Sequence, residues 1–275
     1  MYDLIIIGMG PSGMSAGLYA KRSNLNVLIL ESNAPGGTLL KVKNIDNYLG
    51  FSNTSGKDLA LSMFNHIQDL GIEYKIENVL KIENKKEYKE IITNKEKYKT
   101  KTILITSGKS INKLIINNEN IIADNISYCV ICDGALYKDK NVVLIEETSD
   151  DTEKLYLDNI AKDLKVLKKE EIKNINIENN LVKEIKTSDE TIKTDGVFVA
   201  SGDNIATEFD KDLDIRENGK IKINDKYETK VEGIYASGDV IKKDICQVCN
   251  AVSEGAEAVI SIIKYLGVNK RWMFL

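Results

Sequence analysis

LIIIGMGPSG, residues 4–13, is the stretch that decides the fold. It opens with four apolar residues, which is typical of a parallel strand buried on both faces. The glycines that match the pattern G-x-G-x-x-G are Gly8, Gly10 and Gly13. Residues 14–23 follow with apolar residues at helical spacing, and a second apolar run at 27–30 ends in Glu31. This order predicts a strand, a glycine-rich turn, a helix and a second strand.

Each position of this βαβ pattern has its own physical reason. Gly8 permits the tight turn, Gly10 lets the backbone approach a pyrophosphate, and Gly13 lets helix and strand pack closely. The start of the helix offers amide donors to phosphate groups. Glu31 lies 18 positions after Gly13, near the spacing at which a carboxylate reaches an adenosine ribose. The residues predicted to contact a dinucleotide, FAD or NAD, are Gly8, Gly10, Pro11, Ser12, Gly13 and Glu31.

The composition excludes several classes of protein. Of 275 residues, 43% are hydrophobic and 29% are charged, and no apolar run approaches the roughly 18–20 residues that cross a bilayer. The net charge is −4 and the basic residues are spread along the chain, so we expect neither nucleic-acid nor membrane binding. No basic leader precedes the first strand, which leads us to expect a cytoplasmic protein.

The chain is long enough for two domains. Apolar runs that end in glycine recur at residues 102–108, 196–202 and 233–239. This recurrence suggests that the chain leaves a first domain, builds a second one and returns. We therefore predict an α/β fold with a discontinuous domain at 1–110 and 204–275 around an insert at 111–203. Residues 250–266 have helical spacing and are expected to pack on the first domain.

Four cysteines form two CxxC pairs, Cys129 with Cys132 and Cys246 with Cys249. In a reducing compartment such pairs indicate redox chemistry or metal binding. Four thiolates would make a closed zinc site, which is the alternative reading. We expect no metal site, because no further cluster of ligands surrounds either pair.

The segment around the first pair, ISYCVICDG at residues 126–134, resembles the redox-active segment of low-molecular-weight thioredoxin reductases, a CxxC followed by Asp-Gly. Residues 36–38, 46–51 and 238–240 resemble the flavin-contacting segments of that family. The resemblance implies a two-domain FAD-dependent pyridine-nucleotide-disulfide-oxidoreductase-like fold, a homodimer and thioredoxin as substrate. The further FAD-contacting residues that it implies are Gly37, Thr38, Asn47, Gly238, Asp239 and Gln247.

The same resemblance implies roles for the residues of the first pair. Cys132 would be the thiol next to the flavin, Cys129 would attack the disulfide of thioredoxin, and Asp133 would donate and accept the proton. The second pair has no counterpart, because the family places an arginine and an apolar residue around Gln247. Cys246 and Cys249 form either a second redox pair or, as we favour, small apolar fillers at a helix start.

The insert departs from the NADPH-dependent members of the family. Its strand at 141–145 runs into a segment with the carboxylates Glu146, Glu147, Asp150 and Asp151, and no glycine or arginine occurs from 135 to 195. A side chain at each turn position and like charges both oppose a pyrophosphate. The acidic residues also suit a helix start, with Ser149 as N-cap. This pattern resembles the ferredoxin-dependent flavin thioredoxin reductases, which keep FAD and CxxC but lack NADPH motifs.

The leading prediction is therefore an oxidoreductase that passes electrons from ferredoxin through FAD to thioredoxin. Two alternatives stay open at the level of sequence: an NADPH-dependent reductase with a diverged nucleotide site, and a non-enzymatic flavin redox sensor. His66, the sole histidine, is expected to face solvent or to cap its helix, and we assign it no functional role. For the aromatic tail, with Trp272 and Phe274, the sequence does not choose between disorder, a dimer contact and stacking near the flavin.

Overall fold

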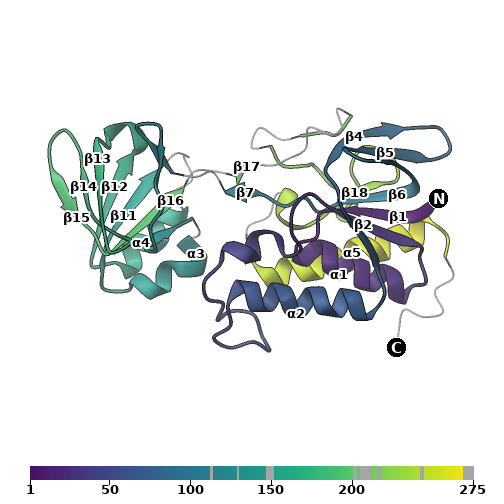
Figure 1. Ribbon diagram of the computed structural model, residues 1–275, viewed down its shortest axis with the longest axis horizontal. Coiled ribbons are helices and arrows are strands. Elements are labelled where there is room, and N and C mark those ends of the chain that lie inside the picture. Colours follow the sequence, from purple (N-terminus) through teal and green to yellow (C-terminus); the bar gives the residue numbers. More distant parts are fainter. Residues whose placement is uncertain are drawn as a thin grey trace. The chain divides into compact units, whose positions relative to one another are not determined.

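The chain passes twice between two units, each with its own sheets and apolar core (Figure 1). One unit comprises Met1–Ser110 with Ile205–Leu275, and the other comprises Ile111–Asn204. The predicted α/β fold with two domains is confirmed. The residues that this computed structural model describes are 1–111, 114–128, 130–146, 152–200, 203–204, 212–215, 219–241 and 245–268.

The first unit is built on one seven-stranded sheet. Its strands are β1 (Tyr2–Ile7), β2 (Val27–Glu31), β3 (Glu73–Ile76), β4 (Val79–Asn84), β5 (Lys89–Thr93), β6 (Lys97–Ile105) and β18 (Ile234–Ala236). Their order is β3-β2-β1-β6-β5-β4, and β18 also pairs with β6. Strands β3, β2, β1, β6 and β18 run parallel, whereas β4 and β5 are antiparallel to their neighbours. Because β18 comes from the second segment of the unit, both segments complete one sheet.

Strand β1 lies inside this sheet and is buried on both faces, which explains its unbroken apolar run. Leu4 and Ile6 belong to the apolar cluster on one face, and Ile5 and Ile7 belong to the cluster on the other. Three helices cover the face of Leu4 and Ile6 (Figure 1). These are α1 (Pro11–Arg22), α2 (Gly56–Asp69) and α5 (Val248–Tyr265), and short 3-10 helices occupy Gly37–Lys41 and Gly238–Val240.

The second unit contains a parallel sheet of order β10-β16-β11-β12 and an antiparallel sheet of order β13-β14-β15. The bounds are β10 (Ile126–Ser127), α3 (Val130–Asp133), β11 (Asn141–Glu146), α4 (Thr152–Ile160), β12 (Asp163–Lys168), β13 (Asn174–Glu178), β14 (Leu181–Lys186), β15 (Thr191–Lys193) and β16 (Gly196–Ala200). Strands β11 and β12 are parallel and α4 connects them, so they form a βαβ unit. Leu157 of α4 packs against Val142 and Leu144 of β11.

Short elements complete this unit and its connections. Strands β8 (Ile115–Ile116) and β9 (Glu119–Asn120) form a hairpin, and 3-10 helices occupy Gly134–Tyr137 and Lys169–Glu171. Strands β7 (Ser110–Ile111) and β17 (Asp203–Asn204) stand where the chain changes units, and they pair with each other.

Several element boundaries differ from those that the sequence predicts. Helix α1 begins at Pro11 rather than at residue 14, because the fixed φ of proline suits the first helical position. Strand β6 begins at Lys97 rather than at residue 102, and exposed lysines alternate with buried Tyr98 and Thr100 in its first half. Helix α4 begins at Thr152, and its predicted N-cap, Ser149, lies outside the described residues.

A buried carboxylate joins β3, β5 and β6. Glu77 is only 6% exposed and accepts hydrogen bonds from the Thr93 hydroxyl at 2.7 Å and the Tyr98 hydroxyl at 3.0 Å. Burial raises the pKa of Tyr98 to about 12. The Glu77 and Glu96 carboxylates add to this increase, and the Lys75 ammonium opposes it. Tyr98 therefore stays a donor at neutral pH, and the carboxylate keeps its partners.

Replacing Glu77 with leucine removes this shared acceptor, so the two buried hydroxyls must turn to more exposed groups. We expect Glu77→Leu to lower the free energy of unfolding by about 1–3 kcal/mol, measured by urea denaturation. The matched control is Glu73→Leu, because Glu73 is exposed and accepts from the exposed hydroxyl of Tyr2. The control is expected to change stability by less than about 0.5 kcal/mol. Equal urea midpoints for the two variants would show that the buried hydrogen bonds of Glu77 do not stabilise the fold.

Candidate functional site

The glycine turn after β1 has no room for side chains at two positions. Gly8 has φ +106°, and a Cβ there would lie 2.4 Å from the carbonyl oxygen of Thr106. A Cβ on Gly13 would lie 2.0 Å from the carbonyl oxygen of Gly8. The absence of both side chains lets the start of α1 approach the ends of β1 and β6. Glycine is therefore required at both positions by the fold itself.

Gly10 differs from its two neighbours in the motif, because a Cβ on it would meet nothing within 4 Å. The space beside Gly10 is thus open, and helix α1 starts there without a side-chain cap. Gly37, with φ +56°, approaches from the adjacent loop, where its Cβ would lie 3.3 Å from the Gly10 Cα. Thr38 follows Gly37 in the 3-10 helix. An open space in front of uncapped helical amides is what a phosphate group needs.

Glu31 ends β2 beside this turn and is 8% exposed. Its Oε2 accepts from the backbone N–H of Met9 at 2.7 Å, and its Oε1 accepts from that of Asn33 at 2.9 Å. The two amides fix the carboxylate over the turn, and each oxygen retains capacity for a further donor. Glu31 is therefore placed to accept from a ribose hydroxyl of a dinucleotide whose phosphates lie at Gly10.

The 3-10 helix Gly238–Val240 is joined to the start of α1. The hydroxyls of Ser12 and Ser237 lie 2.8 Å apart in a buried hydrogen bond. The backbone N–H of Gly238 donates to Glu254 Oε2 on α5 at 2.9 Å. These contacts bring Gly238 and the half-buried Asp239 to the glycine turn. Ser237 and Glu254 are not predicted from the sequence, in which their only signal is that they follow or adjoin the Gly-Asp motif.

A third group of predicted residues lies at the start of α5. The amide of Asn47 donates to Gln247 Oε1 at 2.8 Å, across 200 positions of sequence. Val248 packs against the apolar cluster that contains Leu39 and Ile45. Leu39 lies in the same 3-10 helix as Thr38, so this cluster places Asn47 and Gln247 next to the loop of Gly37. All predicted dinucleotide-contacting residues of the first unit are thus in one region of it.

The redox-active segment predicted from sequence lies in the second unit. Cys129 lies outside the described residues, and the backbone of Cys132 belongs to α3. Asp133 ends α3 half-buried, and its Oδ2 accepts from the Ser127 hydroxyl of β10 at 2.7 Å. A Cβ on Gly134 would lie 2.6 Å from the ring of Tyr156, so the 3-10 helix that follows α3 packs closely on α4. Ser127, which sequence analysis missed, therefore fixes the carboxyl that follows the CxxC pair.

The βαβ unit of the second unit differs from the glycine turn of the first. Residues 147–151 connect β11 to α4 and contain no glycine. They lie outside the described residues, and they include the carboxylates Glu147, Asp150 and Asp151. Glu146 ends β11 half-buried, with Lys168 of β12 and Ala200 of β16 as its register partners. Glu153 adds a carboxylate in the first turn of α4. Negative groups therefore flank both sides of this connection.

The second cysteine pair stands on either side of the start of α5. Cys246 and Cys249 are both thiols, Cys246 is half-buried and Cys249 is exposed. The interpretation of both as buried apolar fillers is therefore wrong for Cys249. The reason is that the helix begins at Val248 rather than at residue 250, so that Val248 faces the apolar cluster and Cys249 turns to solvent.

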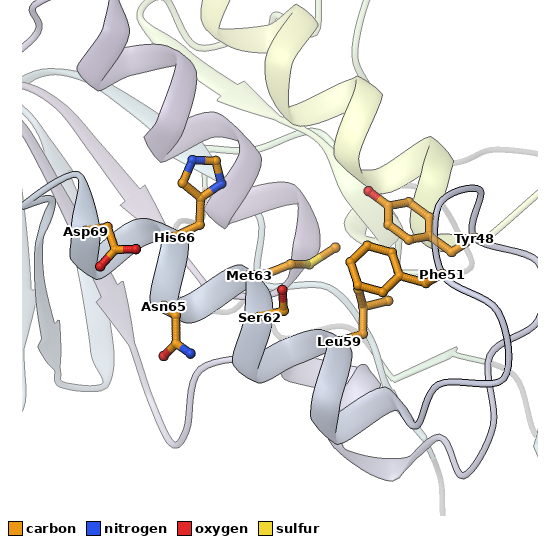
Figure 2. A pocket seen from close by; sticks show the side chains of 8 residues that line it. All are labelled: Tyr48, Phe51, Leu59, Ser62, Met63, Asn65, His66 and Asp69. Atoms are coloured by element: carbon orange, nitrogen blue, oxygen red, sulfur yellow. The ribbon is translucent and has the colours of Figure 1, made fainter.

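A hollow of about 500 Å³ lies along α2, where the side chains of eight residues line it (Figure 2). His66 is among them and is exposed, as the sequence predicts, and Tyr48 and Phe51 stack on each other with ring centroids 5.8 Å apart. The hollow contains none of the predicted site residues. Within the described residues there is no group of three or more metal-ligating side chains. Nor does any helix in the described part combine the length and apolarity required to span a membrane.

Two nucleotide-binding-type α/β units, one with a complete glycine turn and one with a CxxC pair, define a class of two-domain disulfide oxidoreductases. The chain belongs to the pyridine nucleotide-disulphide oxidoreductase family, whose profile matches residues 2–145 and 137–255.

Individual relatives cover nearly the whole chain. Thioredoxin reductase of Bacillus subtilis is 31% identical over 300 residues, spanning 97% of this chain and 95% of that protein. The crystal structure of thioredoxin reductase from Streptococcus pyogenes matches with a TM-score of 0.87 and 31% identity, covering 97% of this chain and 98% of the other. A ferredoxin-flavin thioredoxin reductase from Clostridium acetobutylicum matches with a TM-score of 0.60 and 26% identity, covering 98% and 99%. This chain is thus similar both to a thioredoxin reductase and to a ferredoxin-flavin thioredoxin reductase.

The different surroundings of Gly13 and Gly10 predict opposite effects of one substitution. Gly13→Ala places a Cβ against backbone and should lower the free energy of unfolding by about 1–3 kcal/mol or more, measured by urea denaturation. Gly10→Ala places the same group in open space at φ −79°, and should change stability by less than about 0.5 kcal/mol. Equal destabilisation by both would show that the turn is not packed as described.

Proposed function

We propose that this protein is a flavoprotein disulfide reductase that carries FAD in its first unit and reduces thioredoxin through Cys129 and Cys132. We further propose that its electrons come from reduced ferredoxin rather than from NADPH. The observation that carries the proposal is the contrast between the two βαβ units. The first has a complete glycine turn, and the second keeps the CxxC-Asp-Gly segment but connects β11 to α4 without a glycine.

The residues of the first unit fit FAD. The open space beside Gly10 would take the pyrophosphate, and Glu31 would accept from the adenosine ribose. Asp239, at the start of its 3-10 helix, would hold the ribityl chain, and the hydrogen-bonded pair of Asn47 and Gln247 would contact the flavin ring. The remaining residues proposed as FAD contacts are Gly8, Pro11, Ser12, Gly13, Gly37, Thr38 and Gly238.

FAD, when bound, supplies the ability to take up single electrons in turn and to deliver a pair. The protein supplies the dithiol and the proton. Cys129 attacks the disulfide of thioredoxin, and Cys132 attacks Cys129 in turn and releases the reduced partner. Asp133 exchanges the proton, and the Ser127 hydroxyl at 2.7 Å orients its carboxyl for that task.

Two features of the second unit argue against NADPH. A Cβ at every position of the 147–151 connection blocks the close backbone approach that a pyrophosphate requires. The carboxylates of Glu146 and Glu153 flank that connection, and like charges about 4 Å apart repel by roughly 1 kcal/mol even in bulk water. A ferredoxin donor is thermodynamically adequate, because plant-type centres near −400 mV lie about 130 mV below thioredoxin at about −270 mV.

A second candidate is an NADPH-dependent reductase with a diverged site. The observation that favours it is the pair Lys168 and Lys169 at the carboxyl end of β12, where a dinucleotide-binding βαβ unit contacts the adenosine ribose. Lysine binds phosphate as a point charge rather than by a fork, and Glu170 and Glu171 follow directly. We rank this candidate second because the glycine-free connection opposes it. For either candidate we propose a homodimer, as the family resemblance implies, and a location in the cytoplasm.

The donor is tested by thioredoxin reduction under anaerobic conditions with equal electron equivalents of reduced ferredoxin or NADPH. We expect turnover with ferredoxin and, with NADPH, a rate at least about a hundredfold lower, corresponding to about 2.7 kcal/mol of transition-state stabilisation. Cys132→Ser is the control and should abolish thioredoxin reduction with either donor. Rapid turnover with NADPH alone would establish the second candidate instead.

FAD binding is tested separately with Gly10→Ala, which is expected to leave the fold intact because a Cβ on Gly10 meets nothing within 4 Å. Its Cβ enters the space proposed for the pyrophosphate, so the Kd for FAD should rise at least tenfold, or about 1.4 kcal/mol. The measurement is titration of the apoprotein with FAD, followed by flavin fluorescence. An unchanged Kd in this folded variant would contradict the proposal that the pyrophosphate lies beside Gly10.

A further inference from the structure

A second CxxC pair, Cys246 and Cys249, has no task in the proposed reduction at Cys129 and Cys132. The pair frames the start of α5, where Gln247 is the N-cap and Val248 the first helical residue. Both cysteines are thiols, and Cys249 is exposed while Cys246 is half-buried. An exposed thiol with a second thiol three residues away is the arrangement that thiol–disulfide exchange requires.

The two residues between these cysteines are anchored. Gln247 accepts from the amide of Asn47 at 2.8 Å, and Val248 packs in the apolar cluster of Leu39 and Ile45. Burial and the negative charge of the Cys249 thiolate both raise the pKa of Tyr48, which lines the hollow (Figure 2), so Cys249 lies within electrostatic range of Tyr48. The thiols therefore occupy a defined position next to Gln247 rather than a loose surface loop.

The backbone at Gln247 separates the two thiols. Its φ of −120° and ψ of 160° are extended, so Cys246 stands outside the helical turn that carries Cys249. A disulfide needs Cα atoms within about 4.4–6.8 Å, the separation that a helical turn provides. Closing the ring therefore requires the backbone at Gln247 to leave this extended conformation, from which its side chain now accepts from Asn47.

We propose that Cys246 and Cys249 form a second thiol–disulfide couple, which protein or low-molecular-weight disulfides oxidise and whose oxidation separates Gln247 from Asn47. The exposed Cys249 thiolate attacks one sulfur of the substrate disulfide, whose S–S bond breaks, and the departing thiolate takes a proton. Cys246 then attacks the sulfur of Cys249, forms the internal disulfide and releases the second substrate thiol. The substrate gains two electrons and two protons, and the cysteine pair loses them.

Oxidation of Cys246 and Cys249 is thermodynamically coupled to the hydrogen bond between Asn47 and Gln247. The hydrogen bond between Asn47 and Gln247 is present in the thiol form and, in this proposal, is lost on oxidation, so whatever strengthens it opposes formation of the disulfide. Where Gln247 contacts flavin, as proposed above, a disulfide at this position would change the flavin environment. The exchange reaction itself does not depend on that contact.

The test equilibrates the protein with glutathione buffers of increasing disulfide content, followed by alkylation and peptide mass spectrometry. Trypsin places the two pairs on separate peptides, residues 114–138 and 244–264, so each pair is read independently in the wild-type protein. A Cys129→Ser/Cys132→Ser variant repeats the measurement without the first pair, so that failure of the proposed thioredoxin reduction leaves this result unaffected. We expect the 244–264 peptide to lose two hydrogens and its alkylation sites together as the disulfide content rises.

Asn47→Ala removes the hydrogen bond that opposes oxidation and should shift the equilibrium towards the disulfide about threefold to tenfold. Asn44→Ala, which removes only an amide that donates to Asp46, is the matched control and should give no shift. Two thiols that stay fully alkylated at every ratio, or glutathione adducts without an internal disulfide, would overturn the second couple. Equal equilibrium constants for Asn47→Ala and the control would overturn its link to Gln247.

Discussion

The first unit depends on the contact between backbone and backbone at the glycine turn. A Cβ on Gly13 would lie 2.0 Å from the Gly8 carbonyl, one on Gly8 2.4 Å from the Thr106 carbonyl, and one on Gly255 2.2 Å from the Ser12 carbonyl. These absent side chains let α1 meet β1, β6 and α5 at van der Waals distance. The open space beside Gly10 and the position of Glu31 are consequences of that packing.

The second unit repeats the βαβ connection without this constraint. Strands β11 and β12 pair in parallel and α4 packs on them, yet five residues without glycine connect β11 to the helix. The fold therefore survives without the turn that lets a pyrophosphate approach. What the second unit keeps is the segment around α3, where Ser127 orients Asp133 directly after the CxxC pair. Under the proposed function, this chain thus keeps its dithiol while its electrons enter by a route other than NADPH.

Much of this arrangement is readable in the sequence, because it depends on local patterns. Apolar runs, the glycine spacing and Pro11 predict β1, the turn and α1 to within a few residues. The sequence does not reveal contacts between distant side chains. The bond between Asn47 and Gln247 spans 200 positions, and the buried acceptor Glu77 looks like any surface glutamate in a lysine-rich stretch. The exposure of Cys249 depends on the helix starting two residues earlier than its pattern indicates.

The proposed function requires that the second unit has no site for a nicotinamide dinucleotide. The most direct measurement is isothermal titration calorimetry of the FAD-loaded protein with NADPH and with NADP⁺ under anaerobic conditions. The account predicts no saturable heat up to about 1 mM, equivalent to binding weaker than about −4 kcal/mol. A saturable isotherm with a micromolar Kd would contradict it.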